Sequence, residues 1–166
     1  MSNFGTASDW EKIWQRYLVE SSPQEKERLT ATLTMATQPY LITRLLNYAK
    51  EGKYIKRQDF FTVVRYVGTN TAAEDLVWDW TRENYQSFVD RFTTTDRYFG
   101  RMVYYMVRDY NTELKLQEVK DLFSRFPEAG AGERYRKMAL ESIERNIYWV
   151  THFRPIIIQW LKANVQ

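Results

Sequence analysis

The sequence predicts an all-α protein of about 8 to 10 helices that follow one another in antiparallel pairs. Three observations predict this class. Apolar residues recur with the 3.6-residue period of a helix through most of the chain. Polar capping residues or prolines precede these segments, and glycines or polar breaks follow them. Strand signals are weak, because the β-branched and aromatic run from Phe60 to Val67 lies between helix signals.

The first two helices are predicted from their starts. Asp9 is the expected cap of a helix with one apolar side, formed by Trp10, Ile13, Trp14, Tyr17 and Leu18. Ser22 as N-cap, Pro23 at the first helical position and Glu25 three residues after the cap predict the start of the second helix.

Three further segments complete the first half of the chain. Pro39 begins a helix whose apolar face carries Ile42, Leu45, Leu46 and Ala49. Gly52 lies just past its end, where a left-handed residue is commonly needed. Helices are then expected from Arg57 to Val67, closed by Gly68, and from Thr71 to about Asn84.

The second half continues the pattern. A helix is expected from Asp96 to about Asp109, and another from Asn111, a good cap, to Phe126. The clearest break is Pro127 to Gly132, and the segment from Glu133 to Val150 follows with Ala139, Ile143, Ile147 and Val150 on one stripe. Pro155 begins a last short helix with Ile157, Ile158 and Leu161.

The spacing of these starts bears on the architecture. They fall about 15 to 20 residues apart, so helix pairs recur about every 35 to 40 residues, as in helix-hairpin solenoids. No strict sequence repeat is visible, and a compact bundle with short loops fits nearly as well.

The composition describes one ordered globular domain, 1–166. Of the 166 residues 44% are apolar and 27% charged, there is no cysteine, and the formal charge of +3 is scattered. No apolar run approaches the length of a membrane span, and the N-terminus lacks the features of a secretory signal. We therefore expect no membrane contact by this segment and, without a dense Lys/Arg tract, no nucleic-acid binding.

Catalytic motifs are absent from the sequence. His152 is the single histidine, so neither a zinc-binding helix motif nor a Cys/His cluster can be drawn. Its neighbourhood is typical of a histidine at a helix end or in a linker. Phosphate-binding glycine loops and nucleophile elbows are absent as well. The chain is therefore not expected to be an enzyme by itself, and we assign it no catalytic residue, metal ligand or cofactor.

A series of short motifs, in order and covering about Phe4 to Leu161, resembles the C-terminal helical domain of gluzincin zinc aminopeptidases. The motifs are Asp9-Trp10, Trp14-x-x-Tyr17, Leu41-x-x-Arg44-Leu45-Leu46, Trp78-x-Trp80, Phe99-Gly100-Arg101, Thr112-Glu113-Leu114 and Glu144-Arg145-Asn146-Ile147-x-Trp149. The segment Pro127 to Glu133, with Asn111 to Leu114, is most similar to the glutamyl aminopeptidase branch.

The resemblance implies a right-handed superhelical array of helix pairs, HEAT-like or armadillo-like, that closes over a separate zinc domain. The chain would be only the later part of such a C-terminal domain, and zinc is implied for the missing catalytic domain alone. That domain of the same parent chain and the peptide substrate are the expected partners. The parent would be a membrane-anchored ectoenzyme or a secretory-pathway protein.

The candidate substrate-binding residues are Arg97, Arg101 and Tyr104, which share one side of the helix from Asp96 with Arg108. A solvated surface with long basic side chains explains Arg101 and Arg108 more simply than substrate binding does. The stretch Thr95 to Arg101 matches the glutamyl aminopeptidase pattern, which implies that Arg97 points towards the cavity and holds an acidic substrate side chain. A planar guanidinium can pair both oxygens of a carboxylate.

Two functions follow as hypotheses. The first is a noncatalytic aminopeptidase fragment that encloses the peptide cavity and helps to select the N-terminal residue, an acidic one on the evidence of Arg97. The alternative is a free-standing helical-repeat adaptor that binds a protein or peptide on its concave face. Because a truncated solenoid exposes an apolar face, we also expect an exposed patch near the first helix, or self-association through that end.

Overall fold

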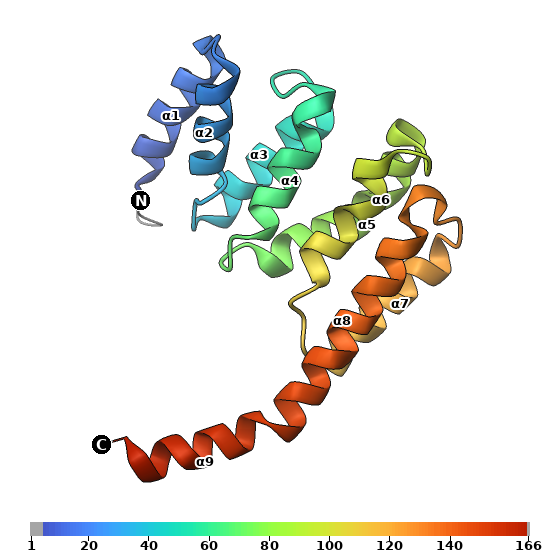
Figure 1. Cartoon of the computed structure of the whole chain (residues 1–166). Helices are drawn as coiled ribbons and strands as arrows, with labels where there is room; N and C mark the ends of the chain where they lie inside the picture. Colours follow the sequence, from blue (N-terminus) through green and yellow to red (C-terminus); the bar gives the residue numbers. More distant parts are fainter. Residues whose placement is uncertain (1–4, 166) are drawn as a thin grey trace. The chain divides into compact units, whose positions relative to one another are not determined.

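The computed structural model describes residues 5–165, and all regular secondary structure in this part of the chain is helical (Figure 1). It holds nine α-helices and two short 3-10 turns, and no strand, which confirms the all-α prediction. The helices form two compact units, Met1–Gln86 and Ser87–Gln166.

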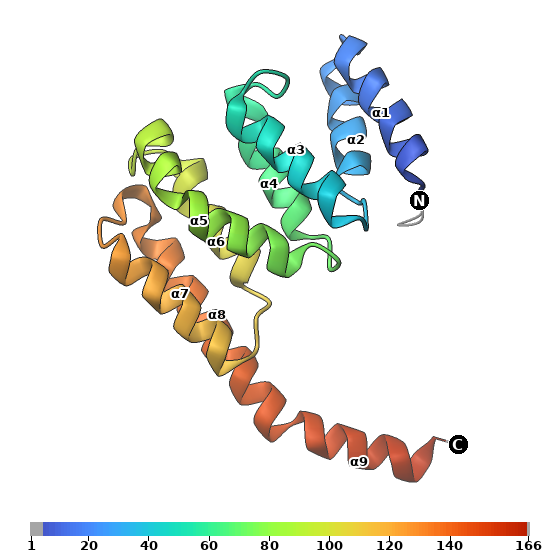
Figure 2. The same ribbon diagram turned by 180° about the vertical axis from the view of Figure 1, so that it is seen from behind.

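Unit 1 consists of helix pairs joined by short loops. α1 (Ala7–Val19) packs against α2 (Pro23–Leu33), and α3 (Pro39–Glu51) packs against α4 (Phe60–Gly68), as Figure 2 also shows. Short connections make each pair antiparallel. A 3-10 turn at Arg57–Asp59 precedes α4, and α5 (Glu74–Phe92) begins in this unit.

Two polar side chains hold the loops of unit 1 to its core. The indole Nε1 of Trp10 donates to the carbonyl of Leu33 at 3.0 Å. The side-chain amide of Asn70 donates to the carbonyls of Thr34 at 2.9 Å and Ala36 at 2.7 Å. Because both donors are buried, each bond satisfies a group that would otherwise destabilise the fold.

The predicted helices are present, but several ends differ. The cap of α1 is Thr6, whose hydroxyl accepts the N–H of Asp9, so Asp9 is the third helical residue of a capping box and not the cap. Thr112 replaces Asn111 as the cap of α7. α5 continues to Phe92, beyond the predicted end at Asn84. The Gly52 stop of α3 is confirmed by a left-handed φ of 75°.

Unit 2 contains α6 (Arg97–Val107), α7 (Glu113–Arg125), α8 (Glu133–His152) and α9 (Arg154–Asn164). α8 packs against both α6 and α7, and a 3-10 turn at Gly130–Gly132 leads into it. The core of this unit is apolar and is formed by Phe99, Met102, Val103, Met106, Val107, Leu116, Val119, Leu122, Ala139 and Ile143.

The exposed apolar surface lies mainly at the other end of the chain from the one predicted. The apolar side of α1 is covered, since Trp10, Trp14 and Tyr17 are buried and only Leu18 and Val19 are exposed. α2 and α3 supply that cover, through Leu33 and Tyr48. At the C-terminal end, every residue from 151 to 165 is exposed. Among the described residues, no helix is long and apolar enough to cross a membrane.

Candidate functional site

The first turn of α6 is fixed by Asp96. Its carboxylate accepts hydrogen bonds from the backbone N–H of Tyr98 at 2.7 Å and of Phe99 at 3.0 Å. The carboxylate thus satisfies two of the free backbone donors at the start of the helix. Its negative charge also interacts favourably with the positive end of the helix dipole. Arg97 lies between this cap and its two donors, so its backbone position is set by Asp96.

A close backbone contact places α6 against the loop before α8. A Cβ atom on Gly100 would lie 2.7 Å from the backbone nitrogen of Gly132 and 2.9 Å from two further backbone atoms. The carbonyl of Thr94 also accepts the N–H of Ala131 at 2.9 Å. Only a residue without a side chain allows this approach. The start of α6 is therefore held to the rest of unit 2 at its N-terminal turn.

The structure separates α6 into a buried and an accessible side. The predicted apolar arc is confirmed, since Phe99, Met102, Val103 and Met106 are all buried. Arg97 is exposed, while Arg101 and Tyr104 are partly exposed. The side carrying the predicted binding residues is thus at least partly exposed to solvent.

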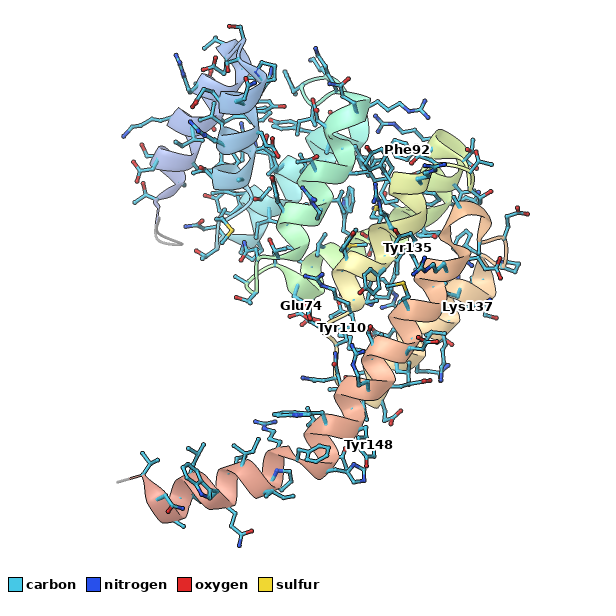
Figure 3. The ribbon with its side chains drawn as sticks, viewed as in Figure 1. Glu74, Phe92, Tyr110, Tyr135, Lys137 and Tyr148 are labelled. Carbon is cyan, nitrogen blue, oxygen red and sulfur yellow. The ribbon has the colours of Figure 1, made fainter. Side chains whose placement is uncertain are left out.

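The three predicted residues share a helix but differ in their surroundings. Arg97 has no hydrogen bond or ion pair to any residue that the structure describes. The guanidinium carbon of Arg101 lies 4.7 Å from the ring centroid of Tyr98. The ring centroid of Tyr104 lies 5.9 Å from that of Tyr135 on α8, which Figure 3 labels. Neither Arg101 nor Tyr104 is bonded to Arg97.

Sequence reasoning missed two aromatic residues of this surface. Tyr98 is 61% exposed and carries Arg101 over its ring. Tyr135 lies in the first turn of α8, and its ring is tilted against that of Tyr104. Its position next to Arg97 in the sequence could have marked Tyr98 as part of this surface. Nothing in the residue spacing indicated which helix would face Tyr104.

The other polar residues singled out from the sequence have local roles. Arg108 is the C-cap of α6, and its Nε lies 3.4 Å from Asp109 in an exposed ion pair. His152 ends α8, as predicted, with Nδ1 2.9 Å from the carbonyl oxygen of Tyr148. Among residues 5–165 no group of three His, Cys, Asp or Glu side chains could hold a metal ion.

Unit 1 contains a polar hollow that the sequence did not indicate. It measures about 430 Å³ and is formed where α1, α2 and the 3-10 turn meet; its lining includes Tyr17, Lys26, Glu27, Lys56 and Asp59. Burial raises the pKa of Tyr17 to about 12, and the Asp59 carboxylate adds to this shift. The Nζ of Lys26 lies 4.7 Å from the Tyr17 ring centroid.

Comparison with known proteins shows that the chain is similar to the C-terminal part of several aminopeptidases. Aminopeptidase A of Gloydius brevicauda is 37% identical over 166 residues, all of this chain and 17% of that protein. Glutamyl aminopeptidase of Sus scrofa is 38% identical over 160 residues, 96% of this chain and 17% of that protein. Aminopeptidase N of Canis lupus familiaris is 25% identical over 164 residues, 98% of this chain and 17% of that protein.

These matches confirm the resemblance stated from the motifs. The chain spans only 17% of the length of these relatives. The model of the ERAP1-like C-terminal domain family matches residues 1–145, most of the chain. The chain therefore belongs to the family of ERAP1-like C-terminal domains.

Proposed function

We propose that the chain is the later part of the C-terminal domain of a zinc aminopeptidase, where it helps to enclose the peptide cavity and to select an acidic N-terminal residue. The relatives support this branch, because identity is 38% to a glutamyl aminopeptidase but 25% to an aminopeptidase N. The parent would be a membrane-anchored ectoenzyme or a secretory-pathway protein.

The unpaired guanidinium of Arg97 carries the proposal. It is exposed, and no described carboxylate neutralises it. It lies in the first turn of α6, where the Asp96 carboxylate already accepts the free backbone N–H groups at the positive end of the helix dipole. The guanidinium of Arg97 is therefore the group at this helix start that is left to pair with an anion. A substrate carboxylate would gain a bidentate, charge-assisted pair there, and the side chain would lose no partner on binding.

Arg101 and Tyr104 would contact the substrate beside Arg97, on the same side of α6. Arg101 is held over Tyr98, so its guanidinium adds positive charge with little freedom to turn away. Tyr104, tilted on Tyr135, offers a hydroxyl and an apolar ring. These residues would bind and orient the substrate, and none of them would break the peptide bond.

Catalysis would belong to the part of the parent outside this chain. The described residues do not fit a zinc ion, since none of them forms a ligand cluster. In the proposed parent, zinc would be held by the other domain and would supply the activated water. This chain would contribute enclosure and charge complementarity.

The test is Arg97→Ala in an aminopeptidase that carries this chain as its C-terminal part. Loss of a bidentate charge-assisted pair should lower kcat/KM for an acidic N-terminal residue by about 10- to 100-fold. The value for a neutral residue should stay within about twofold. Activities on matched acidic and neutral peptides give the ratio.

Arg108→Ala is the matched control, because it removes an arginine of the same helix that is already beside Asp109. It should leave the acidic-to-neutral ratio unchanged. If Arg97→Ala also leaves that ratio unchanged, Arg97 does not select the substrate and the proposal loses its main support.

A further inference from the structure

The polar hollow of unit 1 has no part in the proposed function. It measures about 430 Å³ and lies where α1, α2 and the 3-10 turn before α4 meet. This volume is within the range of small-molecule sites in proteins. The hollow is therefore large enough for a small organic molecule, and its polar lining determines which kind of molecule would bind.

Two partly buried charges of opposite sign line this hollow without a partner. Lys26 on α2 and Asp59 in the 3-10 turn form no hydrogen bond or ion pair with any residue that the structure describes, nor with each other. Asp59 stands at the N-cap position of α4, but its side chain makes no capping hydrogen bond. Because a partly buried charge without a partner costs free energy, each group would gain from a ligand group of opposite charge.

Tyr17 adds a neutral hydrogen-bonding group to the same hollow. The residue is only 3% exposed, yet its hydroxyl has no hydrogen-bond partner among the described residues. Its ring stacks on Trp14, with centroids 5.3 Å apart, and the Nζ of Lys26 lies 4.7 Å from its centroid. Buried polar groups are normally hydrogen-bonded, so an unpartnered phenol beside a hollow indicates a place where a ligand supplies the partner.

The other acidic residues of the lining are already engaged. Glu20 lies 2.8 Å from Arg16 in an ion pair, and Glu27 accepts the hydroxyl of Tyr66 at 2.9 Å. Within residues 5–165 the acidic side chains also form no group of three that could hold a metal ion. The groups left to recognise a ligand are therefore one ammonium, one carboxylate and one phenol, together with the exposed Lys56.

We propose that this hollow binds a small zwitterion, a free α-amino acid, whose carboxylate pairs with Lys26 and whose ammonium group pairs with Asp59. A simple anion would meet the carboxylate of Asp59, and a simple amine would meet the ammonium of Lys26. The Tyr17 hydroxyl can donate to the ligand carboxylate or accept from the ligand ammonium group. The site lies within unit 1, whereas Arg97 belongs to unit 2, so the proposal does not depend on the proposed role in substrate selection.

Titration of the 166-residue chain with amino acids tests the proposal. Proton–nitrogen correlation NMR spectra are recorded with glycine, L-alanine and L-leucine up to about 20 mM, at constant pH and ionic strength. At least one of them should shift the amide signals around the hollow, with a dissociation constant of a few millimolar or tighter. If none gives a saturable shift, the proposal is overturned.

Modified forms of the amino acid that binds test both of its charged groups. The amide lacks the carboxylate and the N-acetyl form lacks the ammonium group, so each should bind at least about 10-fold more weakly. Inorganic phosphate at the same concentrations should give no saturable shift at the hollow. Phosphate binding as tight as that of the amino acid would show a simple anion site and would overturn the proposal.

Two variants identify the protein groups that bind. Lys26→Met and Asp59→Asn should each weaken binding by about 10-fold or more, because one charged group of the ligand loses its partner. The matched controls are Lys12→Met on α1 and Asp79→Asn on α5, whose side chains are 75% and 61% exposed and do not line the hollow. Both controls should bind like wild type.

All four variants should keep the wild-type circular dichroism spectrum and unfolding midpoint, since none of the four side chains is in the core. The loss of affinity is then a property of the hollow and not of the fold. Unchanged binding by either Lys26→Met or Asp59→Asn would overturn the proposal, because a zwitterion needs both charges.

Discussion

Gly100 and Gly132 fix the position of α6 through a backbone contact that no other residue pair could make. The start of α6 carries Arg97, so this contact sets where the proposed binding residue lies. The motif Phe99-Gly100-Arg101 was visible in the sequence, but the partner of Gly100 was not. A glycine that permits close approach cannot be told from one that ends a helix until the two backbones are seen together.

Gly100→Ala should lower the free energy of unfolding of unit 2 by about 3 kcal/mol, because the added methyl group meets three backbone atoms that cannot turn aside. Urea unfolding followed by circular dichroism measures this. Gly5→Ala is the comparison, since its added Cβ would lie 3.8 Å from the Cβ of Asp9, an ordinary contact. Equal effects of the two changes would contradict the role given to Gly100.

Tyr17 should make stability depend on alkaline pH. Its pKa is raised from 10.0 to about 12 in the folded chain, so folding favours the protonated phenol. The resulting stability is complete below pH 10 and is lost as the pH rises towards 12. Wild type should lose about 2 kcal/mol more than Tyr17→Phe over this window.

At pH 7 the same Tyr17→Phe change should alter the free energy of unfolding by less than about 0.5 kcal/mol. Tyr17 lines the hollow of unit 1, and its hydroxyl has no hydrogen-bond partner among the described residues. Chemical unfolding at pH 7, 10 and 11.5 separates the two effects. Parallel curves for both proteins at all three values would show that the phenol ionises equally in the folded and unfolded chain.

At the scale of helices, the sequence predicted which segments are helical better than it predicted where each helix begins and ends. α5 illustrates why, because it was expected to stop near Asn84 and continues to Phe92. Buried Tyr85, Phe88 and Phe92 extend its apolar period, and the helix stops only where Thr93 takes a φ of 65°. Threonine is a poor indicator of that left-handed conformation, which glycine usually adopts.

Asp96→Ala should lower the free energy of unfolding of unit 2 by about 1 to 2 kcal/mol, since two backbone donors of α6 lose their acceptor. Asp96→Asn keeps an acceptor oxygen and should cost only a few tenths of a kcal/mol. Denaturant unfolding of the three proteins gives the comparison. A loss for Asp96→Asn as large as that for Asp96→Ala would point to the charge, and not the cap, as the stabilising feature.

At the scale of the whole chain, ordered motifs identified the family although each motif was weak alone. The helical period also predicted that α6 has a buried and an open side. It did not predict the exposed end. The residues of α9 have the periodicity of a covered helix, and whether a cover is present depends on atoms distant in sequence or outside the chain. The tilted pair of Tyr104 and Tyr135 was missed for the same reason.

Pro155 lies at the start of α9 and favours the break between α8 and α9. The two helices are separated only by Phe153, and a proline has no N–H to offer the carbonyl four residues earlier. The missing N–H of Pro155 thus disfavours one uninterrupted helix through this point, so a molecule that lies against α9 meets two helices with a break between them. Pro155→Ala would restore that N–H and remove the constraint that separates α8 from α9.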